Sequence, residues 1–185
     1  MGTINLVKGQ KINLEKPGGG ELSKVFMGLG WDPARGSDDI DLDASCICFD
    51  ASKNALETIY FGNLSGAGGA ILHSGDNLTG DGDGDDEVIN VDLSRIPSNV
   101  DSIVFTINSF RGQTFNEVDN CFARLVDSTS KQELTMFKLS EKGTNTGVVM
   151  CRIYRYNGQW KMSAMGNAAN GSTASEMIPL IQKLY

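Results

Sequence analysis

The chain has 185 residues, with 23 acidic and 16 basic side chains and a formal net charge of -7 at pH 7. This balance disfavours nucleic acid as a partner, because neutralising phosphates needs a basic patch. The length suits one domain over residues 1–185, and no apolar stretch approaches the roughly 18–20 residues that cross a bilayer. We therefore expect a cytoplasmic protein with no membrane insertion.

Short runs of alternating apolar and polar residues recur along the chain between glycine-rich turns, which predicts a β-sandwich. The expected strands are Ile4–Leu14, Lys24–Trp31, Asp41–Asp50, Leu56–Asn63, Ala70–His73, Val88–Leu93, Ser102–Ser109, Asn120–Val126, Glu133–Leu139, Gly147–Tyr156 and Trp160–Met165. Only Thr173–Leu184 has helical spacing, with Ser172 or Thr173 as its N-cap and Pro179 in its middle. The predicted fold class is all-β, a sandwich of two mainly antiparallel sheets with a short C-terminal helix.

The first acidic cluster, Ser37–Asp43, runs directly into an apolar strand. In a strand, Asp39, Asp41 and Asp43 share one face. The opposite face then holds Ile40, Leu42, Ala44, Cys46 and Cys48. Carboxylates on one face of a strand repel one another unless a cation lies between them. We therefore expect this cluster to lie at the same edge of the fold as a second acidic segment.

That second segment, Gly75–Glu87, holds six carboxylates, one carboxamide and four glycines without a basic residue. Ca²⁺ accepts six to eight oxygen ligands in irregular geometry, so the two clusters are expected to share about two Ca²⁺ ions. The EF-hand template fails, because its third and sixth positions would be Leu78 and Asp81 and the segment after Glu87 has strand periodicity. The alternative is a solvated acidic turn in which Asp-Gly pairs supply only loop chemistry.

Other reactive residue types favour structural roles. All four cysteines lie in apolar, strand-like runs, which predicts reduced core thiols, and their spacing does not match a zinc site. Trp31 ends an apolar run and is expected in the core. The single histidine, His73, has no recognisable nucleophile motif beside it, so a catalytic role is not expected. Arg111 is expected in an exposed turn.

Several ordered motifs together resemble the TerD family of tellurite-resistance and stress proteins, and within it the TerZ branch most. They are GLGWD at Gly28–Asp32, DIDLDAS at Asp39–Ser45, HSGDNLTGDGDGDDE at His73–Glu87, NSF at Asn108–Phe110, ARLVD at Ala123–Asp127 and YRYNGQWKM at Tyr154–Met162. The resemblance implies a calcium-binding β-sandwich with no established catalytic activity. It also implies other Ter proteins as partners, including a membrane-embedded TerC-type protein, and hence a peripheral position at the inner membrane face.

The family's calcium motifs carry over only to matching positions. The implied ligands are Asp41, Asp43, Asp76, Asn77, Gly80, Asp83, Asp85, Asp86 and Glu87, with Gly80 acting through its carbonyl. Two other functions stay open. One is a metal-dependent hydrolase that uses the carboxylates for Mg²⁺ or Mn²⁺. The other is a cyclic-nucleotide-binding protein, since slime-mould relatives of this family are described as binding cyclic AMP.

Overall fold

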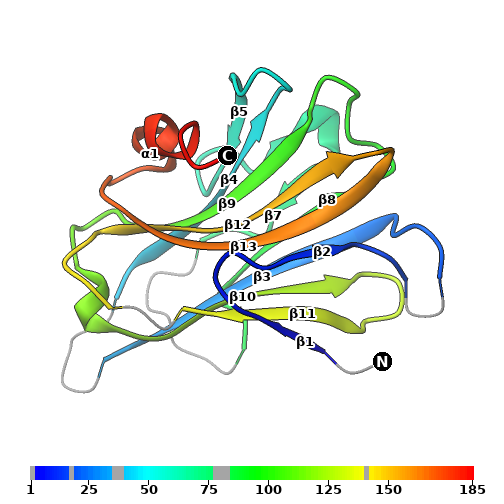
Figure 1. Cartoon of the computed structure of the whole chain (residues 1–185). Helices are drawn as coiled ribbons and strands as arrows, with labels where there is room; N and C mark the ends of the chain where they lie inside the picture. Colours follow the sequence, from blue (N-terminus) through cyan, green and yellow to red (C-terminus); the bar gives the residue numbers. More distant parts are fainter. Residues whose placement is uncertain (1–2, 17–18, 35–39, 77–83, 140–141) are drawn as a thin grey trace.

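The computed structural model describes residues 3–16, 19–34, 40–76, 84–139 and 142–185. These residues form two β-sheets packed face to face, which confirms the predicted sandwich (Figure 1). The β3 sheet contains, in spatial order, β1 (Ile4–Leu6), β11 (Glu133–Lys138), β10 (Val118–Asp127), β3 (Lys24–Pro33), β8 (Glu87–Asp92), β7 (Ile71–His73) and β6 (Ser65–Gly66). The β9 sheet contains β2 (Lys11–Asn13), β13 (Gln159–Ala169), β12 (Gly147–Tyr156), β9 (Ser102–Ser109), β4 (Leu42–Phe49) and β5 (Ala55–Ile59).

Neighbouring strands are antiparallel, apart from the parallel pair β1 and β11. The prediction of one strand over Ile4–Leu14 is wrong, because β1 and β2 lie in different sheets. The chain turns between them at Gly9, whose φ of 84° a β-strand does not allow. The strand predicted over Leu56–Asn63 also ends early, at Ile59, and a turn closed by Tyr60 and Asn63 follows it.

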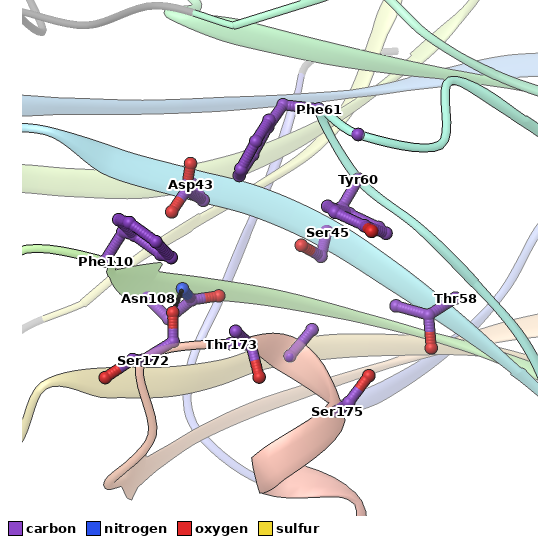
Figure 2. A pocket seen from close by; sticks show the side chains of 12 residues that line it. Asp43, Ser45, Thr58, Tyr60, Phe61, Asn108, Phe110, Ser172, Thr173 and Ser175 are labelled. Atoms are coloured by element: carbon purple, nitrogen blue, oxygen red, sulfur yellow. Dashed lines mark hydrogen bonds between the residues drawn. The ribbon is translucent and has the colours of Figure 1, made fainter.

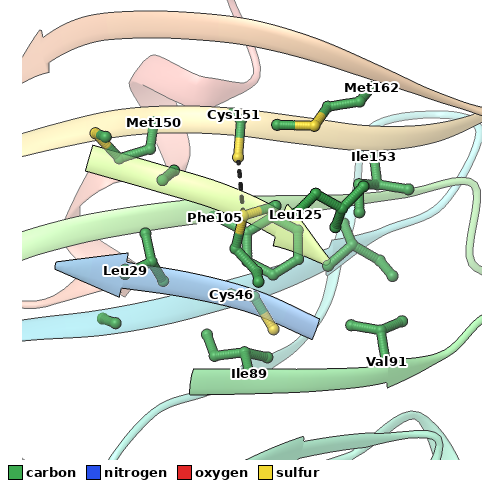
Figure 3. Close-up of a cluster of buried hydrophobic side chains, with 14 of the residues drawn as sticks. Leu29, Cys46, Ile89, Val91, Phe105, Leu125, Met150, Cys151, Ile153 and Met162 are labelled. Atoms are coloured by element: carbon green, nitrogen blue, oxygen red, sulfur yellow. Dashed lines mark hydrogen bonds between the residues drawn. The ribbon is translucent and has the colours of Figure 1, made fainter. Parts of the chain in front are cut away.

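Strand β4 is buried on both faces and contains Asp43, one of the predicted ligands. Its inward face lies in the main core between the sheets and includes Leu42, Ala44, Cys46 and Cys48, as the alternation predicts. Figure 3 shows this core around Phe105, with Leu29 and Ile89 from the β3 sheet facing Cys46 and Cys151 from the β9 sheet. Because close-packed neighbours lie against both faces of β4, they restrict the rotamers of its side chains.

The outward face of β4 is covered by the C-terminal helix α1 (Ala174–Ile181) (Figure 1). Thr173 is the N-cap residue, and Pro179 lies within the helix without ending it. Met177 and Ile181 pack against Ile47 and Phe49, forming a second apolar cluster on this face. Because α1 begins only at Ala174, it covers the later part of β4 and leaves the residues near Asp43 bordering a groove.

The predicted core roles are confirmed. All four cysteines are free and buried, and burial raises the pKa of Cys48 and of Cys121 to about 12. Trp31 is 2% exposed, and its indole N–H donates to the Ile40 carbonyl at 3.2 Å. Within the described residues we find no helix long and apolar enough to cross a membrane.

Candidate metal centre

Three carboxylates from the two acidic segments meet at one end of the sandwich. Asp41 lies just before β4, Asp43 lies within it, and Asp76 follows β7 of the other sheet. One oxygen from each lies within 4.8 Å of the other two. Asp41 and Asp43 are buried, whereas Asp76 is exposed. The predicted proximity of the two acidic segments is therefore present in the fold.

Asp43 is the member of this cluster whose negative charge has the least compensation. Its side chain is 4% exposed, and its Oδ2 atom accepts no hydrogen bond from any described residue. Burial, followed by the nearby charges of Glu87, Asp41 and Asp76, raises the pKa of Asp43 to about 7. A buried acceptor without a donor is costly, so this atom is suited to receive a cation.

Arg111 supplies a positive charge at the rim of the cluster. Its Nε atom lies 2.9 Å from Asp41 Oδ2, while its side chain remains 59% exposed. Burial raises the pKa of Asp41, Arg111 opposes that effect, and Asp76 adds to it. Arg111 lies two residues after β9, the strand that pairs with β4, so sheet pairing brings it to Asp41.

Behind the cluster, a buried group of hydrogen bonds joins the two sheets. Glu87 Oε2 accepts the backbone N–H of Ala44 at 2.8 Å, and His73 Nε2 lies 2.9 Å from the Ala44 carbonyl and 3.2 Å from Glu87 Oε2. The backbone N–H of Gly75 donates to His73 Nδ1 at 3.0 Å, so Nε2 carries the proton of the neutral ring. Both imidazole nitrogens are engaged, and the ring links β7 of one sheet to β4 of the other near Asp43.

Asp85 and Asp86 are adjacent in the chain and make different contacts. Both oxygens of Asp85 accept from Arg124, at 2.7 and 2.8 Å, and this hydrogen bonding raises the pKa of Arg124. The glycine at position 28 makes room for this pair, since a Cβ there would lie 2.2 Å from the Asp85 carboxylate. Asp86 Oδ2 accepts the backbone N–H of Trp31 at 2.8 Å, and burial is the main reason that the pKa of Asp86 rises to about 6.

Of the nine predicted ligands, the structure thus brings together Asp41, Asp43 and Asp76, and it places Glu87 behind them. Asp85 is bound to Arg124, and Asp86 accepts from Trp31. Asn77, Gly80 and Asp83 lie outside the described residues. Ligation by these nine residues stays a prediction.

Sequence reasoning missed three residues of this region as parts of the site. Arg111 was expected only in an exposed turn, and its partner depends on the pairing of β9 with β4. Arg124 reaches Asp85 from β10, across β3. Asn108 is the cross-strand partner of Asp43. Its sequence signals are its place in the NSF motif and an amide side chain in a strand otherwise rich in buried apolar residues.

The sequence matches the TerD domain over residues 1–178. The chain belongs to the TerD family. This confirms the resemblance identified from its motifs. The chain is 49% identical to the tellurium resistance protein TerZ of Serratia marcescens over 184 residues, which cover 94% of each protein. It is 42% identical to general stress protein 16U of Bacillus subtilis (strain 168), over 93% of this chain and 94% of that protein.

A solved structure supports the fold of this TerD-family chain. A homologue of telluride resistance protein (TerD) from Streptomyces coelicolor superimposes with a TM-score of 0.71 and 18% sequence identity, covering 85% of this chain and 95% of that one. At this level of identity the likeness establishes the shared fold. The relatives named above are resistance and stress proteins, which places this chain among proteins of that kind.

Proposed function

We propose that this TerD-family chain is a non-catalytic calcium-binding protein of the tellurite-resistance and stress-response type. The observation that carries the proposal is Asp43, a buried carboxylate whose Oδ2 atom has no donor among the described residues and which lies beside Asp41 and Asp76. An oxygen-only cluster of this kind suits a hard divalent cation.

Calcium fits this donor set better than magnesium. The three carboxylates come from separate segments, and one of them is exposed, so the cluster favours an ion that tolerates irregular geometry over one that demands an octahedron. Asp41, Asp43 and Asp76 would hold the first ion. A second ion, which would complete the expected two, would use the predicted ligands between Asn77 and Asp83. When bound, calcium would offset the repulsion among these carboxylates.

A role without catalysis is supported by His73, whose ring nitrogens are both engaged in buried hydrogen bonds. Binding the ion only in the folded state would stabilise the protein by about 2.7 kcal/mol at a hundredfold excess over Kd. Calcium could thereby order a surface for other Ter proteins, including a membrane-embedded TerC-type partner. We propose the cytoplasm, at the inner membrane face, as the place of that contact.

Calorimetric titration of chelator-stripped protein with Ca²⁺, and separately with Mg²⁺, tests the proposal. We expect Ca²⁺ to bind at least about tenfold more tightly than Mg²⁺, because the cluster is irregular and rich in oxygen. Equal or tighter Mg²⁺ binding would contradict the calcium assignment. The absence of saturable heat with either ion would contradict the metal centre itself.

Replacing Arg111 with Gln is expected to tighten calcium binding roughly fivefold. Its guanidinium lies beside Asp41 and repels an incoming cation, and removing such a charge near the surface gains about 1 kcal/mol. The matched control is Arg95→Gln, which removes the same charge from another exposed position. An equal gain in both variants, or no gain in Arg111→Gln, would show that Arg111 does not act locally on the site.

A further inference from the structure

A groove of about 380 Å³ lies beside the carboxylate cluster, on the outer face of the β9 sheet. Its floor comes from β4 and β9, one wall from the turn after β5, and the other wall from the start of α1 (Figure 2). The volume lies in the range of small-molecule sites. Asp43 borders both the groove and the carboxylate cluster.

Two side chains that line the floor of the groove each carry a buried acceptor that no described residue satisfies. The acceptors are Asp43 Oδ2 and Asn108 Oδ1, from side chains that are 4% and 1% exposed and that face each other across the β4–β9 pair. The amide of Asn108 is oriented by its Nδ2 atom, which donates to the Ser172 carbonyl at 2.8 Å. Two buried acceptors side by side call for a ligand that donates hydrogen bonds to both.

The rim above Asp43 is aromatic. Tyr60, Phe61 and Phe110 are 38%, 38% and 56% exposed, although large aromatic side chains gain most when buried. Their rings touch edge to face, with centroids 5.3 Å apart for Tyr60 and Phe61 and 6.4 Å apart for Phe61 and Phe110. Figure 2 shows Phe61 and Phe110 on either side of Asp43. Such rings offer apolar contact and also attract a cation.

The charge of the groove indicates which donor it accepts. Among its described lining residues are no lysine, arginine or histidine, and Asp43 is its one acidic side chain. Arg111, which follows Phe110 in the chain, is paired with Asp41 instead. A neutral donor would satisfy the two acceptors but would leave the carboxylate charge unmatched. A positively charged donor satisfies the acceptors, the charge and the aromatic rim together.

We propose that this groove binds a small organic ammonium ion, whose N–H groups donate to Asp43 Oδ2 and Asn108 Oδ1 and whose apolar body lies against Phe61 and Phe110. A primary ammonium has three donors, enough for both acceptors and one surrounding hydroxyl such as that of Ser45. The site uses described residues only, and it does not depend on a metal ion. Asp43 belongs to both sites, so bound calcium is expected to weaken binding of the amine.

Titration of the full-length, chelator-stripped protein with 2-phenylethylamine at pH 8 tests the proposal, with 2-phenylethanol as the uncharged probe of the same shape. We expect the amine to bind at least about tenfold more tightly than the alcohol, because only the amine matches the carboxylate charge. Equal binding of the two probes would overturn the proposal, as would the absence of saturable amine binding. Since chelator is present, these outcomes are independent of whether calcium binds.

Variants locate the binding. Asp43→Asn is expected to lower the affinity for the amine by about tenfold or more. Phe110→Leu is expected to lower it about fivefold, since leucine keeps apolar bulk but lacks the ring. Phe110 is exposed, so its variant keeps the test informative if Asp43→Asn fails to fold. The matched controls are Asp119→Asn, a partly exposed carboxylate paired with Lys142, and Tyr156→Leu, an exposed aromatic outside the groove. Losses of amine affinity in these controls as large as those in the groove variants would overturn the assignment.

Discussion

Replacing Asp43 with Asn is expected to lower calcium affinity roughly a hundredfold, or about 2.8 kcal/mol. The substitution keeps the shape of the side chain and removes the buried charge at the centre of the cluster. An amide oxygen can still ligate calcium, but it no longer supplies a negative charge close to the ion. Calorimetric titration of chelator-stripped protein measures the loss.

The same variant is expected to be more stable than the wild type when calcium is removed. The pKa of Asp43 is about 7 in the folded protein against 3.8 as its ordinary value. A raised carboxyl pKa means that the fold favours the protonated form, so its contribution to stability falls as pH rises from about 4 to about 7. At pH 8 the ionised carboxylate costs on the order of a few kcal/mol, and asparagine avoids this cost.

Urea unfolding at pH 8 therefore separates a binding role from a packing role. Without calcium we expect the variant to unfold at higher urea than the wild type, and with saturating calcium we expect that order to reverse. Asp119→Asn, which also removes one negative charge, is expected to leave both properties nearly unchanged. Retained calcium affinity in Asp43→Asn, or a loss of stability in both conditions, would contradict this account.

The second large effect is expected from Arg124→Leu, which should lower the free energy of unfolding by about 3 kcal/mol. Both oxygens of Asp85 are bonded to Arg124, and the Asp85 side chain is only 8% exposed. Removing the guanidinium leaves a nearly buried carboxylate without its partner, and Glu133 also loses a contact of 3.1 Å. Urea unfolding measures the change.

A double-mutant cycle distinguishes this pair from general packing. Adding Asp85→Asn to Arg124→Leu is expected to restore part of the lost stability, because no uncompensated charge then remains. The control Arg95→Leu removes an exposed arginine and should cost less than about 0.5 kcal/mol. A loss below about 1 kcal/mol in Arg124→Leu, or additive single effects, would show that the pair contributes little.

The sequence alone determined the fold class, the core faces and the acidic character of the site. Alternation of apolar residues is a local property, and it correctly placed Ala44, Cys46 and Cys48 on the inward face of their strand. The exceptions were local as well. Gly9, with its positive φ, divided the expected strand Ile4–Leu14 between two sheets.

The tertiary structure alone decided which of the acidic residues act together. Asp41 and Asp43 reach Asp76 because β4 and β7, from opposite sheets, approach at one end of the sandwich. Asp85, from the same acidic motif, instead meets Arg124 of β10. Sequence spacing cannot show these partners, because they depend on strand order, and strand order arises from contacts between residues far apart in the chain. The motif thus determined the kind of chemistry, and the packing of the two sheets decided where it is assembled.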